Sequence, residues 1–162
     1  MSKDDGIALI SDARRAAGDG KEDSFESAAW ARLIHAADVH GFASNWLDIQ
    51  CRSFEGVIRG AVILRTSEAA AFAPVGVWPE GIQGSPRLAA VVERALQDRR
   101  VVVEGIKRVP NRQEPVFIAH PILVDDELYG AAALEIEGRS EGAVRDLVQR
   151  LGWGIGWLEA LA

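Results

Sequence analysis

The feature that most constrains this chain is a pair of apolar segments on either side of an acidic turn, within residues 116–136. Side chains alternate between the two faces of a strand, and both sets here are largely apolar, so both faces must be covered. One face of the first segment holds Val116, Ile118, His120, Ile122 and Val124. Consecutive short acidic residues favour a solvated turn, which we place at Asp125-Asp126-Glu127. The pattern predicts the central hairpin of an antiparallel sheet.

The second segment of the hairpin carries small residues between larger ones. Gly130, Ala131, Ala132 and Ala133 follow one another ahead of the apolar end at Ile136. Small side chains on a strand let another layer of structure lie close to the sheet. We therefore expect a second layer to pack closely over this part of the hairpin.

Two further strands are predicted before the hairpin, at Val57–Arg65 and Phe72–Trp78. In the first of them Val62 and Leu64 alternate with apolar neighbours, as expected for a strand that is covered on both faces. The two strands follow each other closely in the sequence. They are therefore expected to pair as antiparallel neighbours.

A helix at 86–100 separates these strands from the hairpin. Ser85 is a suitable cap, Pro86 suits the first helical turn, and the apolar residues recur at helical spacing. Arg99 and Arg100 are expected at its C-terminal end, where cations suit the helix dipole. A short strand at 101–104 and a loop at 105–115 then lead into the hairpin.

Helices are also predicted at both ends of the folded part. The first begins near residue 24, is interrupted near Gly41 and continues over 42–52. The last covers 141–162, with an apolar stripe at helical spacing. Residues 1–23 mix charges, glycine and alanine and are predicted to form a flexible tail, so the domain is expected to cover 24–162.

Composition narrows the class of protein. The chain has 162 residues, which is enough for one domain with a core and short for two. Its net charge of −6 argues against a general nucleic-acid or membrane-surface binder. Cys51 is the single cysteine, so no internal disulfide can form. Together with the absence of a signal peptide or membrane span in the sequence, this predicts a cytoplasmic protein.

The hairpin resembles the closing hairpin of GAF domains, which are sensor relatives of PAS domains. The resemblance lies in Pro121-Ile122-Leu123-Val124, the acidic turn, Leu128-Tyr129-Gly130 and the alternating strand that ends at Ile136. The predicted order of elements is also that of GAF domains. The resemblance implies an α+β fold with an antiparallel sheet of about five or six strands. It also implies that the first and last helices pack together on one face.

A finer resemblance concerns the GAF modules at the N-terminus of bacterial haemolysin-secretion-type (membrane-fusion) adaptor proteins. It is carried by Trp46-Leu47 with Gln50-Cys51, by Phe72-Ala73-Pro74-Val75 with Trp78-Pro79, and by Gly152-Trp153-Gly154 with Trp157-Leu158-Glu159. The resemblance implies a bacterial regulatory module of a larger protein related to transport or secretion.

GAF domains form a ligand pocket between the sheet and the elements opposite the terminal helices. The resemblance therefore makes Trp78, Phe117, His120 and Tyr129 candidate pocket residues. A group of basic residues could steer an anionic ligand such as a cyclic nucleotide. Its members are Arg87, Arg94, Arg99, Arg100, Lys107, Arg108 and Arg112. The alternative is that the aromatic residues at strand spacing belong to the core.

The end of the last helix is unusually rich in glycine and tryptophan. Gly152, Gly154 and Gly156 each cost roughly 1 kcal/mol in a helix relative to alanine, so some contact must offset them. Trp153 and Trp157 point away from the apolar stripe and form a second apolar face. That face is expected either to pack within the chain or to form a homodimer interface through the terminal helices. The interface candidates are Trp30, Trp153, Trp157 and Leu161.

The sequence does not favour an enzyme. No metal-ligand spacing, phosphate-binding loop or nucleophile elbow is present, so we expect no catalytic residue, no metal and no cofactor. GAF-type methionine sulfoxide reductases use several cysteines, and this chain has only Cys51. An enzyme of that kind stays an alternative to a non-catalytic sensor. Another alternative is an assembly domain whose pocket is filled by its own side chains. An apolar plug beneath 86–100 would favour assembly, and an open cavity there would favour sensing.

Overall fold

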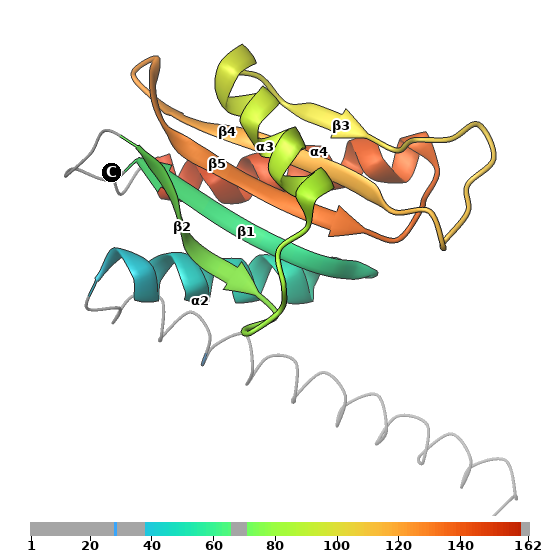
Figure 1. Cartoon of the computed structure of the whole chain (residues 1–162), viewed down its shortest axis with the longest axis horizontal. Helices are drawn as coiled ribbons and strands as arrows, with labels where there is room; N and C mark the ends of the chain where they lie inside the picture. The colour runs from blue at the N-terminus through green and yellow to red at the C-terminus, as the bar shows by residue number, and fades with distance from the viewer. Residues whose placement is uncertain (1–27, 29–37, 66–70, 160–162) are drawn as a thin grey trace, which may run out of the picture.

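The computed structural model describes residue 28 and residues 38–65 and 71–159. Figure 1 shows one antiparallel sheet with α3 in front of it and α4 behind it. The elements, in chain order, are α2 (Val39–Ser53), β1 (Val57–Arg65), β2 (Phe72–Trp78), α3 (Pro86–Asp98), β3 (Val102–Glu104), β4 (Val116–Val124), β5 (Glu127–Ile136) and α4 (Glu141–Glu159). The fold is thus α+β, and the order of elements agrees with the sequence prediction.

The sheet has five strands in the order β2-β1-β5-β4-β3. All four neighbouring pairs are antiparallel. The hairpin strands β4 and β5 therefore occupy interior positions, as their apolar faces require. The predicted pairing of β1 with β2 is confirmed, and the sequence also placed the bounds of both strands correctly.

The central hairpin is confirmed, with a tighter turn than predicted. Leu123 pairs with Leu128 and Val124 pairs with Glu127, so only Asp125 and Asp126 lie in the loop. Both have positive φ, 49° and 62°. That conformation matches a two-residue turn whose twist suits a hairpin, and aspartate adopts it more readily than most residues. Glu127, expected in the turn, is the first residue of β5.

Each face of the sheet carries its own apolar core. Beneath α3 lie small and medium side chains, among them Ala119, Ala131 and Ala133. The opposite face packs against α2 and α4 with larger side chains, among them Trp46 and Leu151. The covering of both faces that the hairpin pattern predicts is therefore confirmed, and α2 and α4 share one face while α3 covers the other.

Two helix boundaries differ from the prediction. Helix α2 begins after Asp38, whose side chain accepts a hydrogen bond from the Gly41 amide at 2.7 Å, so Gly41 lies in the first turn and does not interrupt the helix. Helix α3 ends at Asp98, and Arg99 takes a left-handed conformation with φ 53°. The sequence placed Arg99 and Arg100 inside this helix, but the reversal of the chain into β3 comes first. The predicted tail 1–23 and the residues Trp30 and Leu161 lie outside the described residues.

Strand β2 forms one edge of the sheet and is not a regular edge. Its register shifts opposite Val62 and Ile63, and Pro74 lies at this bulge, where an edge strand tolerates proline. His40 Nδ1 lies 3.2 Å from the Val75 carbonyl oxygen. Helix α2 lies so close to this strand that a Cβ on Gly76 would approach the Ala43 backbone at 3.3 Å. These features blunt the edge against pairing with another strand.

Candidate functional site

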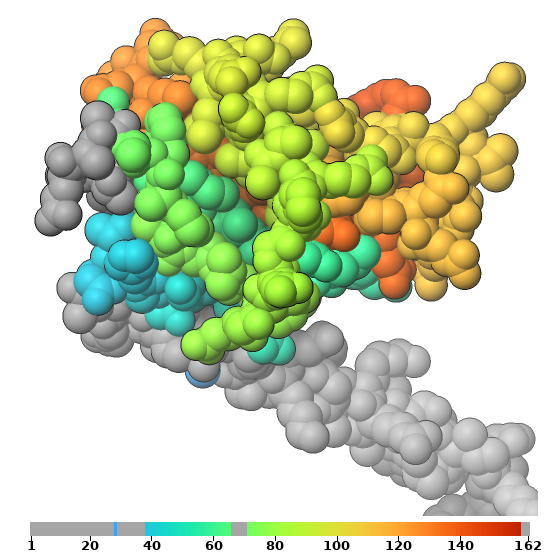
Figure 2. Space-filling model, in the orientation of Figure 1, coloured from blue at the N-terminus to red at the C-terminus, as the bar shows by residue number. Residues whose placement is uncertain are grey.

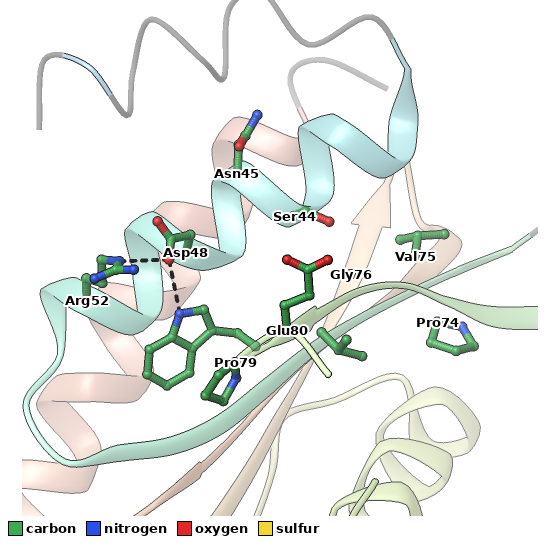
Figure 3. Close-up of a pocket in the computed structure, with 11 residues that line it drawn as sticks. Ser44, Asn45, Asp48, Arg52, Pro74, Val75, Gly76, Pro79 and Glu80 are labelled. Atoms are coloured by element: carbon green, nitrogen blue, oxygen red, sulfur yellow. Dashed lines mark hydrogen bonds and ion pairs between the residues drawn. The ribbon is translucent and has the colours of Figure 1, made fainter. Parts of the chain in front are cut away.

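A groove of about 740 Å³ lies between α2 and β2 (Figure 3). Helix α2 contributes polar side chains, including Ser44 and Asp48. The strand contributes an apolar wall that continues into Pro79, and the acidic Glu80 follows it. Most of these residues are exposed, so the groove is open to solvent. In Figure 3 the Glu80 carboxylate points from the end of the strand toward Ser44 on the helix.

Asp48, which lines this groove, accepts hydrogen bonds from both the strand and its own helix. Its Oδ1 accepts a hydrogen bond from the Trp78 indole at 3.1 Å and one from Arg52 Nε at 2.7 Å. The arginine lies one helical turn further along α2, and it neutralises the carboxylate. The indole is half-buried, so its N–H requires a partner. The bonds join helix to strand and leave Glu80 as the carboxylate that is directed into the groove.

On the other face of the sheet, α3 lies over a filled interior. Val91, Ala95, Ala119, Ala131 and Ala133 are all fully buried there. The alanines of β4 and β5 bring the helix close to the sheet, as their small size predicts. Phe117 closes the cluster near the start of the helix, and the Arg87 guanidinium lies 4.5 Å from its ring centre. These buried side chains lie between α3 and the sheet, on the side where the resemblance placed a ligand.

An ion pair between β1 and β5 has one buried partner, Glu135. Arg59 Nε on β1 and Glu135 Oε2 on β5 are 2.8 Å apart, but the N–H does not point at the oxygen, so the contact is an ion pair without a hydrogen bond. Arg59 also donates a hydrogen bond to the Gln83 carbonyl at 2.8 Å. It therefore ties the segment between β2 and α3 to the sheet. Sequence reasoning missed this pair, because nothing in the spacing of the two residues indicates that β1 pairs with β5.

Helix α4 presents two different apolar surfaces. Toward the core, Trp46 on α2 donates its indole N–H to the Gly154 carbonyl at 3.0 Å. A Cβ on Gly154 would approach the Gln50 side chain at 2.7 Å, so only glycine allows the two helices this close. Away from the core, Trp153 and Trp157 are 68% and 62% exposed. The second apolar face predicted for this helix is therefore directed outward.

The four predicted pocket residues do not line one cavity. Trp78 belongs to the α2–β2 groove. Phe117 is buried under α3, and His120 faces the opposite side, where its Nε2 lies 3.2 Å from the Cβ position of Gly152 on α4. Tyr129 is packed against the α2–α4 core, with the Arg65 guanidinium 5.6 Å from its ring centre. Phe117 and Tyr129 therefore belong to the apolar cores, as in the alternative that aromatic residues at strand spacing are core residues.

The predicted basic group is also dispersed, and most of its members have partners. Arg94 is paired with Glu104, and Lys107 is paired with Glu114. Arg112 lies 3.8 Å from a Glu137 carboxylate oxygen. The group therefore does not converge on a single point where it could bind one anion. Whether the chain binds an anionic ligand stays a prediction.

Metal and thiol chemistry find little support in the described part of the chain. No cluster of three or more His, Cys, Asp or Glu side chains is placed there to hold a metal ion. Cys51 is buried in the α2 core, and burial, with a smaller contribution from Asp48, raises the pKa of its thiol far above the ordinary value. None of the helices within the described ranges is long and apolar enough to span a bilayer.

No family model and no curated protein sequence matches this chain. Solved structures do match it in fold. The A. aeolicus Nlh2 GAF domain in an inactive state is 15% identical, has a TM-score of 0.59, and matches over 86% of this chain and 94% of its own. The GAF domain of an Acinetobacter phosphoenolpyruvate-protein phosphotransferase is 13% identical, has a TM-score of 0.51, and matches over 83% and 92%.

A third match is the chromophore-binding domain of an unusual bacteriophytochrome from R. palustris. It is 14% identical, has a TM-score of 0.51, and matches over 86% of this chain and 62% of its own. Identities this low report the shared fold and leave activity and ligand open. The chain therefore has the fold of GAF domains, as the hairpin and the order of elements predict.

Proposed function

We propose that this domain is a non-catalytic regulatory module that works by self-association through its terminal helices. The observation that carries the proposal is the outward apolar face of α4, where Trp153 is 68% exposed. An exposed indole of this size is costly in water and is typical of interaction sites. The fold of regulatory GAF domains is consistent with this role and does not by itself establish it.

The filled interior beneath α3 supports assembly over small-molecule sensing. The fully buried residues Val91, Ala119 and Ala133 occupy the space where a GAF ligand would be expected. A ligand there would have to displace a packed core, at a cost of several kcal/mol. Binding of a small anionic ligand between the sheet and the loops is thus less well supported than self-association through the terminal helices. We expect calorimetry with a panel of nucleotides to show no heat of binding.

The geometry of α4 suits a symmetric helix pair. Outside its own helix, no described residue comes within 4 Å of the Cβ position of Gly156, which lies about one turn from Trp153. In an antiparallel pair of α4 helices, the indole of one copy would lie over the glycine of the other. The same contact would then be repeated by the two-fold axis. This arrangement also explains why a helix interior keeps an exposed glycine that costs about 1 kcal/mol relative to alanine.

The burial of Cys51 supports the non-catalytic part of the proposal. A thiol is nucleophilic as the thiolate, and burial disfavours that form here. The chain offers no other cysteine for reductase chemistry. We expect the domain to leave free methionine sulfoxide unreduced, with Cys51→Ser as the control that shows any background. Reduction that depends on Cys51 would favour the enzyme alternative.

The proposed setting of the domain comes from the sequence resemblance alone. The tryptophan and glycine motifs of α2, β2 and α4 support a module of a larger, cytoplasmic part of a transport or secretion adaptor. Expression of the complete gene product and its fractionation into soluble and membrane pools tests this setting. A complete product that stays in the soluble pool would contradict a membrane-fusion adaptor.

Sedimentation velocity of purified variants tests the dimer. We expect the wild-type chain to dimerise, and Trp153→Arg and Trp157→Arg to stay folded and to lose the dimer that forms through α4. The control is Ala89→Arg, which adds the same charge at an exposed position of α3 and should leave the dimer intact. A wild-type chain that sediments as a monomer at high concentration, with unchanged circular dichroism, would overturn the proposal.

A further inference from the structure

The loop between β3 and β4, residues 105–115, extends beyond the end of the sheet (Figure 1), and its side chains project from the surface in the space-filling view (Figure 2). Its base is held in place. A Cβ on Gly138 would lie within 1.8 Å of the Asn111 carbonyl oxygen, so the loop rests directly on that glycine. The Glu114 amide donates to the Asn111 carbonyl oxygen at 3.0 Å, and Lys107 pairs with Glu114 across the base. The tip is thus presented in a defined position.

The tip is basic and apolar, and no described residue neutralises its central arginine. Val109 is 78% exposed, the largest value among the exposed large apolar residues that the structure describes. Arg108 precedes it, and it makes no ion pair with a described residue. Pro110 follows it, so the tip reads Arg-Val-Pro. The chain bends at Arg108 and Val109, and the fixed φ of Pro110 restricts the backbone that follows, so the tip presents a cation next to an exposed apolar side chain.

The α2–β2 groove has the complementary chemistry. Trp78 and Pro79 form part of its apolar wall, and Pro79 is exposed. Glu80 directs its carboxylate into the groove, and it makes no ion pair with a described residue. The groove therefore offers an apolar surface next to an unneutralised negative charge. The loop tip offers an apolar surface next to an unneutralised positive charge.

The two features lie on opposite sides of the molecule. The loop joins the strands β3 and β4, and the groove flanks β2 at the other edge of the sheet. A contact between them therefore joins two copies of the chain. It is also heterologous, because the loop of one copy meets the groove of the next, and the rotation between copies decides whether a ring or an open chain forms.

We propose that the 105–115 loop of one copy docks into the α2–β2 groove of a second copy, with Arg108 against Glu80 and Val109 against the Trp78–Pro79 wall. This contact is separate from the symmetric α4 interface proposed above. It would extend dimers into higher assemblies. Because it includes an exposed charge pair, it weakens as salt is raised.

Charge exchange between the two surfaces tests the contact. The variants Arg108→Glu and Glu80→Arg are each made in the Trp153→Arg background, so that the α4 interface does not contribute. In that background we expect the parent to associate in a salt-sensitive way in sedimentation velocity. Each charge reversal alone should weaken this association about tenfold or more, since like charges then face each other. An equimolar mixture of the two variants should associate again, because each loop then meets a groove of opposite charge.

Matched variants keep the outcome specific. Arg100→Glu and Glu93→Arg make the same charge changes at exposed positions away from the loop and the groove, and their mixture should behave as the parent does. A synthetic 105–115 peptide in excess should suppress the association of the parent, and the peptide with Arg108→Glu should not. If the peptide binds but the chains themselves do not associate, the groove takes a basic partner other than a second copy, and the proposal is overturned.

The result also separates this contact from the α4 dimer. Loss of the dimer in Trp153→Arg with residual salt-sensitive association supports both proposals. Association that is unchanged by Trp153→Arg and lost in the charge variants overturns the α4 dimer and retains the loop contact. A parent that stays monomeric in the Trp153→Arg background at every concentration and salt overturns the loop contact alone.

Discussion

The two faces of this sheet are covered in different ways. On the α3 face, alanines such as Ala131 and Ala133 bring a single helix down onto the strands, and these alanines are fully buried. On the α2–α4 face, large side chains such as Trp46 and Leu151 fill the core. Beyond that core the same two helices carry an open groove and an exposed pair of indoles. Both faces contain a buried core, and the α2–α4 side also carries the exposed surfaces that we propose for contact with a partner.

This difference bears on how a GAF fold can be used. A fold that leaves space under α3 can admit a ligand there, whereas in this chain α3 packs on a cluster of fully buried residues that includes Ala119, Ala131 and Ala133. The surfaces that remain belong to the helices at the ends of the folded region and to the loops at the ends of the sheet. Site chemistry therefore has to be read from the side chains of each chain and does not follow from the fold. Four substitutions test the contrast, from the largest expected effect to the smallest.

Trp46→Ala should have the largest effect. It removes a fully buried indole and the hydrogen bond to the Gly154 carbonyl, which together join α2 to α4. We expect the free energy of unfolding to fall by about 3–5 kcal/mol, measured by guanidinium denaturation. Trp46→Phe keeps most of the apolar volume and should lose less. A loss below about 1 kcal/mol for Trp46→Ala would mean that the α2–α4 junction is not part of the stable core.

Ala133→Leu tests whether the α3 face is closed. The residue is fully buried, so the larger side chain should force α3 away from the sheet and lower the free energy of unfolding by about 1–3 kcal/mol. Ala89→Leu, at an exposed position of α3, is the control and should be nearly neutral. If Ala133→Leu instead raised the melting temperature, unfilled space would lie beneath the helix, and the ligand hypothesis would regain its basis.

Asp48→Ala tests the outer layer of the open face. It removes the acceptor of the Trp78 indole bond and the partner of Arg52, both near solvent. We expect a loss of about 0.5–1.5 kcal/mol in chemical denaturation. Asp48→Asn retains an acceptor oxygen and should lose less. Equal losses for the two variants would show that the charge of Asp48 matters more than its hydrogen bond to Trp78.

Trp153→Arg should have the smallest effect on stability and the largest on association. An exposed side chain outside the core is expected to change the free energy of unfolding of the monomer by about 0.5 kcal/mol or less. The unfolding curve is measured at low protein concentration, where the dimer does not contribute. A loss comparable to that of Trp46→Ala would place the Trp153 face within the core and would remove the contrast between inner and outer surfaces of α4.

Much of the fold could be predicted from local pattern. Alternation in Val57–Arg65, Phe72–Trp78 and the hairpin gave correct strands, since side-chain alternation is a property of consecutive residues. The end of α3 at Asp98 could not be predicted in this way. Arginine is a good helix former, and only the need to reach β3 turns the chain at Arg99.

The site was less predictable because it joins residues that are remote in the sequence. Trp78 was identified, but its partner Asp48 and the groove carboxylate Glu80 were not, because the helix–strand contact between α2 and β2 has no local signature. Phe117 and His120 were also predicted to lie in one candidate pocket, and the structure separates them. They belong to one strand, but residues an odd number of positions apart face opposite sides of the sheet.

The sequence by itself determined the elements, the central hairpin and the need to cover both of its faces, because these depend on spacing that neighbouring residues carry. It also indicated that α4 has a second apolar face at Trp153 and Trp157. Only the tertiary structure decided that the residues under α3 are fully buried and that those indoles point outward. It also decided that Asp48, Trp78 and Glu80 meet in one groove. Packing and burial depend on which distant residues come together, and local periodicity does not specify that.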